Sequence, residues 1–425
     1  MEWLEVEGGR PLAGSVRPSG AKNAALKLMA ASLLADGPCV LGRVPRIRDV
    51  EAMRGLLEAV GARAAWSGPQ ELAVHRSGEL LGELPEQLVG ALRASVQLAG
   101  PLVALGCPVR LGRPGGCEIG DRPLDLHLQG LAALGVRVEE RGSWWELYPP
   151  RRLSGAEVVL EYPSVGATEN VMMAASRARG TTIIYNPARE PEVVELQGFL
   201  RAMGARVEGA GGPCIRIEGR DALEGARWEV MPDRIETATW LLAAAITGGH
   251  VEVAPAVPQH LGAVVQALQE AGVGVSWGDG WMRAEGASGG RVRAVSIQTQ
   301  PYPGFPTDVQ PLWTALMTVA RGVAVVREEV YSRRFGYVSQ LWAMGADIRV
   351  EGRHAVVRGA RLHPARVQAT DLRGGAALVL AALAAQGLSH IGGLSHLDRG
   401  YEELAAKLAG LGGRVRRVRS EPVPA

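Results

Sequence analysis

Lysine is the scarcest charged residue of this 425-residue chain. Of its 46 basic residues only Lys22, Lys27 and Lys407 are lysines. Where arginine is so strongly preferred, a retained lysine is a candidate for a compact ammonium group that does what a guanidinium cannot. We expect Lys27 and Lys407 to lie on solvated helix faces, and we keep Lys22 as a functional candidate.

Cysteine is also rare, with Cys39, Cys107, Cys117 and Cys214 as its four occurrences. Their spacing matches no zinc or redox motif, and so few cysteines in so long a chain do not suggest a disulfide framework. Cys39, Cys107 and Cys214 lie in strand-like runs, so we interpret them as small core residues.

Long apolar runs and a strong charge of one sign are missing too. The longest apolar stretch, Ala376 to Leu388, is too short to span a bilayer. The N-terminal residues, MEWLEVEGGRPLAG, lack the basic and apolar segments of a signal peptide. A formal net charge of +2 gives no reason to expect nucleic acid or a membrane as partner. We therefore expect a cytoplasmic enzyme or binding protein.

A short signature recurs down the whole chain: a helical pattern ends in a small or apolar residue, then comes glycine, then a strand pattern. Successive glycines lie 67 to 74 residues apart, at Gly61, Gly135, Gly204, Gly272, Gly345 and Gly412. Glycine directly after the last apolar position is typical of a helix C-terminus. The length favours two domains, so six units are expected to divide three and three.

Each repeat carries an Ala/Leu-rich helix, a turn, a short strand, a loop, a second helix and the strand after the glycine. This order predicts an α/β class in which parallel strands face the helices. No repeat contains the G-x-G-x-x-G fingerprint or a Walker A loop, so a nucleotide-cofactor Rossmann domain lacks its main support. Polar residues present in one repeat only are the candidates for chemistry.

The starts of the first helices hold several such residues. They are Lys22 and Asn23 in SGAKNAAL, Ser164 to Asn170 in PSVGATEN, Asp233, Arg234 and Glu236 in PDRIET, Thr307 and Asp308 in FPTDVQ, and Asp371 and Arg373 in TDLR. Many of the Ser, Thr and Asp residues can be plain N-caps rather than functional residues. For Thr168, Thr237 and Thr307 we favour neither interpretation over the other. Lys22, Arg234 and Arg373 oppose the helix dipole, and cations beside free N–H groups fit an anionic ligand such as phosphate.

The loops before the second helices are rich in arginine and acid, except for that of the first repeat. Arg122, Arg189, Arg334 and Arg399 occupy corresponding positions and would clamp a phosphate or carboxylate if they converge. Solvated arginine is the alternative, which we favour for Arg333 and keep open for Arg189.

Cys117 differs from the other cysteines, because it follows Gly115 and Gly116 in a glycine-rich loop with no apolar pattern. The flanking Arg113 and Arg122 favour a thiolate, and so a nucleophile or a usable proton donor. These residues alone indicate a reactive loop thiol.

Asp308 has two interpretations. It can cap the helix that follows, in competition with Thr307. If Thr307 is the cap, Asp308 is free to accept a hydroxyl proton from a substrate, and we favour this role of general base.

Taken together, these strings resemble the UDP-N-acetylglucosamine 1-carboxyvinyltransferase family. The resemblance runs from about Gly9 to Val418 and rests on eight motifs in family order: SGAKNAAL, PGGCEIGDRP, PSVGATEN, REPEVV, PDRIET, FPTDVQ, TDLR and DRGYE. A single one of these motifs would be weak evidence, but eight in order along a whole chain are strong.

The resemblance implies a two-domain inside-out α/β barrel built from six repeated units, with helices inside and sheets outside. Residues 1–21 join residues 231–425 in one domain, and residues 22–230 form the domain with the Cys117 loop. The active site is implied in the cleft between them. The implied partners are phosphoenolpyruvate and UDP-N-acetylglucosamine, with no metal and no organic cofactor, and we expect a monomer or weak oligomer.

The resemblance also implies roles in an addition–elimination reaction. Lys22, Arg122 and Arg399 would hold the phosphate and carboxylate of phosphoenolpyruvate, with Asn23 beside the reacting centre. Asp308 would take the proton of the sugar 3′-hydroxyl, and Cys117 would protonate C3 or trap phosphoenolpyruvate covalently. Substrate-binding positions implied beyond these are Arg93, Pro123, Leu124, Asp125, Leu126, Ser164, Val165, Gly166, Val330, Asp371 and Arg373.

Some positions depart from the family pattern. Tyr162 stands where some members have a lysine near the nucleotide, which puts that contact in doubt. Glu118 and Asp121 stand beside the cysteine where small residues are common, and like charges disfavour a thiolate. We therefore prefer Cys117 as a proton donor over Cys117 as a nucleophile.

Two other functions fit parts of the pattern. One is the sister enzyme enolpyruvylshikimate-phosphate synthase, which lacks the PGGC loop. The other is a relative that binds a UDP-sugar without turning it over. Lys22, Cys117, Asp308 and Arg399 are all present here, which argues against such a loss of activity.

Overall fold

The structure of the protein, a computed structural model, describes residues 2–76, 78–115, 119–120, 123–287 and 290–419. These residues form two compact units. Unit 1 contains residues 2–19, 119–120 and 232–419, and unit 2 contains residues 20–115 and 123–231, apart from the gaps just given. Two of the changes from one unit to the other fall between described neighbours, at Ser19–Gly20 and at Met231–Pro232.

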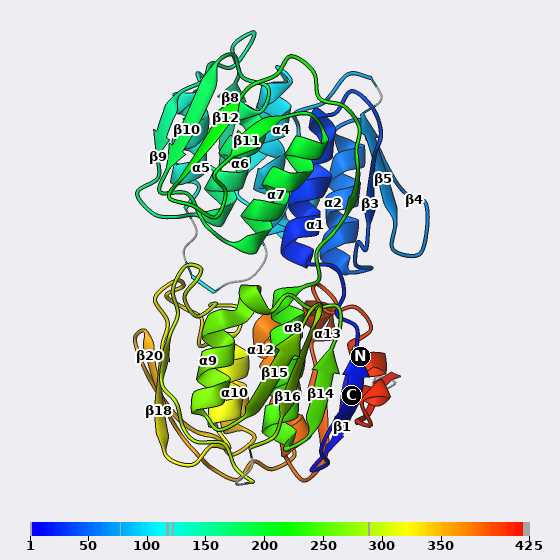
Figure 1. Ribbon diagram of the computed structural model, residues 1–425, viewed down its shortest axis with the longest axis vertical. Coiled ribbons are helices and arrows are strands. Elements are labelled where there is room, and N and C mark those ends of the chain that lie inside the picture. The colour runs from blue at the N-terminus through cyan, green and yellow to red at the C-terminus, as the bar shows by residue number, and fades with distance from the viewer. Residues whose placement is uncertain (1, 77, 116–118, 121–122, 288–289, 420–425) are drawn as a thin grey trace. The chain divides into compact units, whose positions relative to one another are not determined.

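Unit 2 consists of short strands and of helices of unequal length (Figure 1). Its strands are β3 (Cys39–Gly42), β4 (Ala62–Trp66), β5 (Leu72–Arg76), β6 (Val109–Gly112), β7 (Arg137–Arg141), β8 (Trp144–Tyr148), β9 (Glu157–Val159), β10 (Thr181–Tyr185), β11 (Arg206–Glu208), β12 (Cys214–Glu218) and β13 (Arg227–Glu229). Its helices are α1 (Lys22–Ala31), α2 (Arg48–Ala59), α3 (Glu86–Ala91), α4 (Ala99–Ala104), α5 (Asp125–Ala133), α6 (Val165–Ala175) and α7 (Pro191–Ala202), with 3₁₀ helices η1 (Ser32–Leu34) and η2 (Arg93–Leu98).

Unit 1 has the same kind of composition. Its strands are β1 (Glu2–Gly8), β2 (Ala13–Val16), β14 (His250–Val253), β15 (Gly274–Gly278), β16 (Trp281–Glu285), β17 (Ile297–Gln298), β18 (Val323–Arg327), β19 (Asp347–Glu351), β20 (His354–Arg358), β21 (Arg366–Gln368), β22 (Gly387–Gly392) and β23 (Arg414–Arg419). Its helices are α8 (Arg234–Thr247), α9 (Gly262–Glu270), α10 (Gln310–Met317), α11 (Val338–Trp342), α12 (Leu372–Ala384), α13 (Leu394–Leu397) and α14 (Leu404–Gly410), with the 3₁₀ helix η3 (Pro258–Leu261).

Each unit contains three small sheets among its described residues. Five of the six have a parallel strand pair at one edge, and the sixth, β6-β8-β7, is antiparallel throughout. Orders such as β9-β10-β12-β11 and β17-β18-β20-β19 place a parallel pair at one edge and an antiparallel hairpin at the other. The expectation of parallel strands is therefore wrong for most pairs. The sequence signature showed one strand after each glycine, whereas the structure adds a hairpin partner to it, which makes the sheets mixed.

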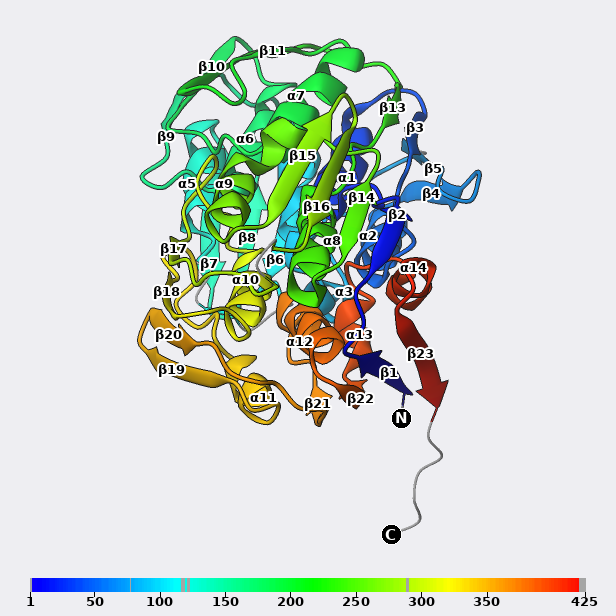
Figure 2. The same cartoon turned by 60° about the horizontal axis from the view of Figure 1, so that its bottom comes forward.

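Three strands pair with strands that are far from them in the sequence. In unit 2, β13 pairs in parallel with β3, and in unit 1 β2 pairs in parallel with β14. Strand β1 lies between β22 and β23, where it replaces the hairpin partner that the last repeat lacks (Figure 2). The first residues of the chain thus complete the sheet built by its last residues.

The six repeat glycines have the backbone conformation that the sequence predicts. Their φ angles lie between +83° and +99°, a region that side chains with a Cβ avoid. Five of them directly follow the C-cap residue of a helix, and Gly345 comes one residue later, after α11. A strand begins within two residues of each glycine, so this part of the prediction is confirmed.

The core of each unit is formed by helices that are buried on all sides. In unit 1, α8, α10 and α12 pack against one another, and nearly every residue of these helices is buried. In unit 2, α4, α5 and α7 surround α6, which is buried from Ala167 to Ala175. An all-apolar Ala/Leu helix is typical of such a position, and each fully buried Leu or Val stabilises the fold by about 1.5–3 kcal/mol.

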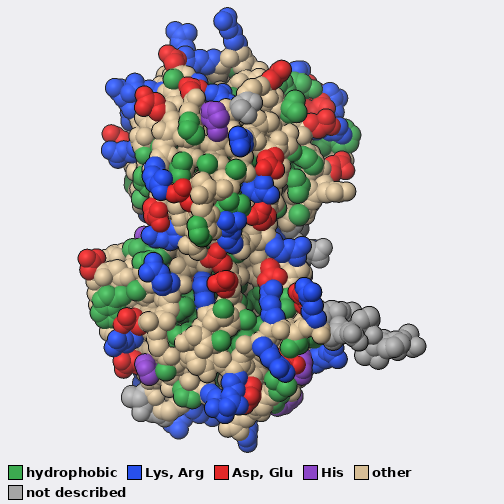
Figure 3. Space-filling view, turned by 90° about the vertical axis from the view of Figure 1, so that its right-hand side faces the viewer, with side chains coloured by type: hydrophobic (Ala, Val, Ile, Leu, Met, Phe, Trp, Pro, Cys, Tyr) green, Lys and Arg blue, Asp and Glu red, His purple; other side chains and the backbone are tan. Residues whose placement is uncertain are grey.

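No described helix is both long and apolar enough to cross a membrane. On the face shown in Figure 3, acidic and basic side chains are interspersed rather than gathered by sign. The interpretation of three cysteines as core residues holds only for Cys39, because Cys107 is partly exposed and Cys214 is exposed. Cys214 is in a strand, but its side chain belongs to the outer face of the sheet.

Candidate functional site

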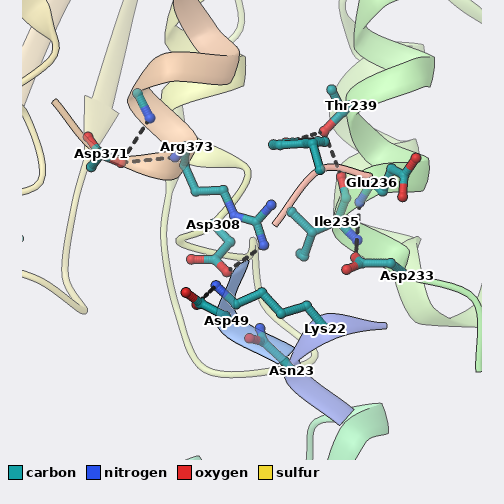
Figure 4. A network of polar contacts seen from close by, with 12 residues as sticks. Lys22, Asn23, Asp49, Asp233, Ile235, Glu236, Thr239, Asp308, Asp371 and Arg373 are labelled. Carbon is teal, nitrogen blue, oxygen red and sulfur yellow. Dashed lines mark hydrogen bonds and ion pairs between the residues drawn. The ribbon is translucent and has the colours of Figure 1, made fainter. Parts of the chain in front are cut away.

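Asp308 lies between two buried arginines of unit 1. Arg334 Nη2, from the loop before α11, donates to Asp308 Oδ1 over 2.6 Å, and Arg373 Nη2, from the first turn of α12, donates to Oδ2 over 3.3 Å (Figure 4). Helix α10 has Val309 as N-cap with no side-chain cap. Neither cap interpretation is therefore right: the Asp308 carboxylate is held by guanidinium groups.

The two arginines keep their charge although they are almost inaccessible, with 3% and 5% of their side chains exposed. Burial is the largest single effect and lowers the pKa of each guanidinium, but the Asp308 carboxylate and further acidic groups nearby together outweigh it and raise the pKa of both Arg334 and Arg373. Three of their buried donors, Arg334 Nε and Nη1 and Arg373 Nη1, have no hydrogen-bond acceptor among the described residues.

Three helix starts carry plain N-caps. The side chain of Asp233 accepts from the N–H groups of Ile235 and Glu236, and that of Asp371 from those of Arg373 and Gly374 (Figure 4). Ser164 accepts from Ala167 N in the same way. The capping interpretation is therefore right for these residues, and the Asp371 cap also places Arg373 beside Asp308.

The three threonines for which both interpretations were kept open are not N-caps. Thr168 Oγ1 accepts from Ala188 N, Thr237 Oγ1 donates to the Asp233 carbonyl, and Thr307 Oγ1 donates to Glu328. Arg234 is buried, with its guanidinium 5.8 Å from the centre of the Tyr302 ring.

Glu328 is a functional candidate that the sequence did not reveal. It is fully buried, and its carboxylate accepts from Thr299 and Thr307 and from the N–H groups of Val330 and Tyr331. It therefore fixes both the segment before Asp308 and the loop with Val330. An acid directly after a strand gives no signal of such a role, since most such acids are solvated.

In unit 2, Lys22 is held by a partner that the sequence also left out. Its Nζ lies 2.6 Å from Asp49 Oδ2, and the two side chains are 12% and 4% exposed. Asp49 stands at the start of α2, after the one connecting loop that looked unremarkable. The ion pair orients the Lys22 ammonium at the first turn of α1, next to the partly exposed Asn23.

The expectation that Lys27 and Lys407 are solvated is wrong. Lys27 Nζ lies 3.4 Å from the fully buried Glu169, whose pKa burial raises to about 7 despite this cation. Lys407 Nζ lies 2.6 Å from Glu236 and donates to Ser19. Each contact joins helices from different repeats, so a helical pattern within one repeat gives no sign of it.

The predicted nucleotide-sugar residues of unit 2 lie on three elements that pack together. Arg93 begins η2, Leu124 and Leu126 flank the start of α5, and Ser164 to Gly166 begin α6. Pro123 and Asp125 are exposed. Between these elements lie Gln97 and His127, which the sequence did not single out, and Asn170, the last residue of the PSVGATEN motif.

Several predicted residues stand apart or cannot be placed. Cys117, Arg122, Glu118 and Asp121 lie outside the described residues. Arg399 is partly buried after α13 in unit 1, Tyr162 is 44% exposed, and Arg189 and Arg333 are exposed, as favoured for Arg333. The described residues contain no group of His, Cys, Asp or Glu side chains arranged as a metal site.

Comparison with known proteins gives a consistent result. Residues 6–408 match the family model described as EPSP synthase (3-phosphoshikimate 1-carboxyvinyltransferase). Two curated relatives are UDP-N-acetylglucosamine 1-carboxyvinyltransferase 1 of Carboxydothermus hydrogenoformans, 45% identical over 99% of both chains, and that of Symbiobacterium thermophilum, 48% identical over 98% of this chain and 95% of the relative.

Solved structures show the same likeness. The enolpyruvyl transferase NikO from Streptomyces tendae is 28% identical, with a TM-score of 0.89 over 99% of both chains. An EPSP synthase from Acinetobacter baumannii, 17% identical, covers 99% of this chain and 100% of its own, with a TM-score of 0.75. The latter likeness concerns the fold alone, which is the mixed α/β fold of enolpyruvyl transferases.

Proposed function

The chain belongs to the UDP-N-acetylglucosamine 1-carboxyvinyltransferase family, and on this premise we propose that it transfers the enolpyruvyl group of phosphoenolpyruvate to the 3′-hydroxyl of UDP-N-acetylglucosamine. Phosphate is the second product, and the reaction is the first committed step of peptidoglycan synthesis. The observation that carries the proposal is the identity of 45–48% with named members along nearly the whole chain.

The Asp308 arrangement supports the chemistry. In the proposed reaction Asp308 takes the proton of the 3′-hydroxyl while that oxygen attacks C2 of phosphoenolpyruvate, and Cys117 protonates C3. The C2–O bond to phosphate then breaks, and loss of a proton from C3 regenerates the enol double bond. Arg334 and Arg373 orient the Asp308 carboxylate through their ion pairs with it.

The remaining roles are proposed from the family resemblance. Lys22, Arg122 and Arg399 hold the phosphate and carboxylate of phosphoenolpyruvate, with Asn23 at the reacting centre. The nucleotide sugar is bound by Arg93, the residues 122–126 and 164–166, and Val330, with Asp371 and Arg373 completing the site. Fixed cations stabilise the charge that develops on phosphate most strongly where water is excluded. The reaction requires no metal or organic cofactor.

We also propose the inside-out barrel as the architecture, with residues 1–21 and 231–425 in one domain and residues 22–230 in the other. Three sheets and a fully buried set of helices in each unit support this proposal. Catalysis then requires that residues of both domains reach the same pair of substrates. A cytoplasmic location and a monomeric or weakly oligomeric state stay predictions.

Phosphate release with alternative acceptors tests the reaction. The purified protein is incubated with phosphoenolpyruvate and either UDP-N-acetylglucosamine or shikimate 3-phosphate. We expect release only with the nucleotide sugar. Release only with shikimate 3-phosphate would reassign the chain to the function named in the family model, and release with neither would contradict transfer of the enolpyruvyl group.

Fosfomycin tests the proposed cysteine. Attack of the Cys117 sulfur on the epoxide forms a C–S bond and opens the ring, so the protein gains the mass of one fosfomycin molecule. We expect this gain in the presence of UDP-N-acetylglucosamine and its loss in Cys117→Ala, which keeps Cys39, Cys107 and Cys214. Modification of another cysteine, or none, argues against the role of Cys117.

A further inference from the structure

Lys407 is one of three lysines in the chain, and the proposed reaction assigns it no role. It lies on α14 of unit 1, with 16% of its side chain exposed. Its Nζ donates to Glu236 Oε1 over 2.6 Å and to the Ser19 hydroxyl over 2.7 Å. Two charge-assisted contacts thus hold a side chain that is otherwise among the most flexible.

The Ser19 hydroxyl links Lys407 to a second carboxylate. An ammonium group only donates, so the hydroxyl oxygen accepts from Lys407 and its own hydrogen is donated to Glu402 Oε2 over 3.0 Å. Ser19 is buried, with 5% of its surface exposed. The three side chains therefore form a chain of hydrogen bonds with one direction, from Lys407 through Ser19 to Glu402.

The main chain of Ser19 is fixed by the start of α8, where Asp233 and Glu236 lie (Figure 4). The N–H group of Ser19 donates to Glu236 Oε2 over 2.9 Å, and its carbonyl accepts from the N–H group of Asp233 over 2.9 Å. Glu236 is 1% exposed and also accepts from Trp240 Nε1 over 3.1 Å. Both the main chain and the side chain of Ser19 therefore have partners in unit 1.

These contacts define a set of four side chains, which we call the Ser19 network: Ser19, Glu236, Glu402 and Lys407. The network connects three motifs that are far apart in the sequence, SGAKNAAL, PDRIET and DRGYE. Two of these motifs carry a cation that is proposed to hold phosphoenolpyruvate, since Lys22 follows Ser19 by three residues and Arg399 precedes Glu402 by three. The network thus anchors the chain at points close to both cations in the sequence.

The segment that follows Arg399 depends on outside contacts for its conformation. Glu403 has a left-handed φ of +51°, which is strained for a residue with a Cβ and persists only where neighbouring contacts enforce it. The Tyr401 hydroxyl lies 2.8 Å from Thr239 Oγ1 on α8, and Glu402 is held by Ser19. Two successive residues between Arg399 and the strained position are therefore tied to other elements of unit 1.

We propose that Lys407 is a positioning residue for phosphoenolpyruvate, which acts through Ser19 and Glu402 to hold the Arg399 segment in the conformation that receives this substrate. The proposal rests on the proposed function, because that function assigns Arg399 to phosphoenolpyruvate. A segment that is fixed before the substrate arrives loses less conformational entropy on binding. The residues proposed for the nucleotide sugar lie on other segments, so the network should affect the two substrates differently.

Ser19→Ala is the main test, because it breaks the link to Glu402 and leaves the ion pair between Lys407 and Glu236 intact. In steady-state kinetics we expect the KM for phosphoenolpyruvate to rise about 5- to 50-fold and the KM for UDP-N-acetylglucosamine to change less than about twofold. Lys407→Met, which removes the first donor of the chain, should raise the KM for phosphoenolpyruvate at least as much. An unchanged KM for phosphoenolpyruvate in Ser19→Ala, or an equal rise for both substrates, would overturn the proposal.

The double variant Ser19→Ala/Lys407→Met tests whether the two residues act through one link. Its KM for phosphoenolpyruvate should rise clearly less than the product of the two single rises, because members of one hydrogen-bond network are coupled. A rise equal to that product would mean that they act independently and would contradict the proposal. Ser389→Ala is the matched control, since Ser389 is a fully buried serine of β22 in unit 1 and lies outside the network. It should keep both KM values.

Hydrogen exchange without substrates reads the segment itself. Ser19→Ala should exchange faster than the original protein in peptides that cover residues 399–403, whereas Ser389→Ala should exchange there as the original does. Peptides from α6 of unit 2 should be unchanged in both variants. Unchanged exchange of residues 399–403 in Ser19→Ala overturns the proposal even if Lys407→Met does not fold. The measurement needs no turnover, so faster exchange in a protein that releases no phosphate contradicts the proposed function alone.

Discussion

The buried carboxylates of this chain are held either by a cation or by a set of N–H and O–H donors. Asp49 has Lys22 and Glu236 has Lys407, whereas Glu328 has two threonine hydroxyls and two backbone N–H groups. Glu195, on α7, accepts from Met231 N and Trp228 Nε1 through Oε1. Where such donors do not offset desolvation fully, the pKa of the acid rises, and this makes stability depend on pH.

Glu195 gives the clearest case of this dependence. Burial raises the pKa of Glu195 to about 7 from 4.5. Between these values the folded protein binds a proton that the unfolded chain has lost, so the free energy of unfolding falls as pH rises through this window. Glu195→Gln keeps Oε1 as acceptor and removes the titration. We expect the variant to be about 1–3 kcal/mol more stable than the original at pH 8 and equally stable near pH 4.5.

Urea denaturation at both pH values measures the difference. Glu169 has a pKa of about 7 for a similar reason, but it is present in both proteins and cancels. Glu208→Gln, at an exposed position of β11, is the control and should follow the original protein at both pH values. An equal stability of Glu195→Gln and the original at pH 8 would contradict the argument.

Asp308 is the residue on which catalysis should depend most directly in unit 1. Asp308→Asn cannot accept the hydroxyl proton, so we expect kcat to fall about 10²- to 10⁴-fold. It also removes the anion between Arg334 and Arg373 and should destabilise unit 1, since breaking a buried pair costs about 3–5 kcal/mol. Measuring kcat and urea denaturation checks both, with Asp347→Asn on exposed β19 as control. A kcat within threefold of the original would exclude Asp308 as the base.

At the scale of elements, the repeated helix–glycine–strand junction decides the path of the chain. A positive φ at the glycine turns the chain back, so the strand that follows can lie on the helix it has just left. The space around these glycines differs from one repeat to another. A Cβ on Gly61 would meet Glu79 O at 2.8 Å, whereas a Cβ on Gly204 would meet nothing within 4 Å.

Because of this difference, replacing glycine by alanine should destabilise the fold by different amounts at the two positions. Gly204→Ala, at a φ of +92°, should cost about 1–2 kcal/mol from backbone strain alone. Gly61→Ala, at a φ of +93°, should cost at least ~1 kcal/mol more, because the backbone at Glu79 must also move. Urea denaturation of the two variants measures both costs. Equal costs, or the reverse order, would show that the close approach of Glu79 does not destabilise the Gly61 variant.

At the scale of the whole molecule, unit 1 depends on both ends of the chain. Strand β1 pairs with β22 on one side and β23 on the other, and α12 packs against it. Val6, in the middle of β1, is fully buried. A local change near the N-terminus should therefore be felt by elements at the opposite end of the sequence.

Val6→Asp tests this dependence, because an unpaired carboxylate at a buried position costs several kcal/mol. In hydrogen exchange we expect protection to fall in β22, β23 and α12 of unit 1 and to persist in α6 of unit 2. Glu7→Gln, which removes only surface ion pairs, those with Arg414 and Arg10, should leave both patterns unchanged. An equal loss of protection in both units would mean that they unfold as one.

The sequence by itself determines those features that depend on residues close together in the chain. The six glycines, the Ala/Leu-rich helices and the motifs at helix starts depend on residues a few positions apart, and they predicted the repeat, the α/β class and the family. Asp308, Lys22 and Arg373 stood out for the same reason, since each opposes or competes with an ordinary helix start.

Only the tertiary structure decided which charges meet. Lys27 with Glu169, Lys407 with Glu236, and Asp308 with Arg373 are partners from different repeats, whereas Lys22 with Asp49 and Asp308 with Arg334 join two segments of one repeat. Glu328 and His127 gave no signal because their surroundings are built by other segments of the chain. Helical periodicity reports the neighbours along one element, whereas burial and pairing depend on what packs against it, and a single sequence does not contain that information in local form.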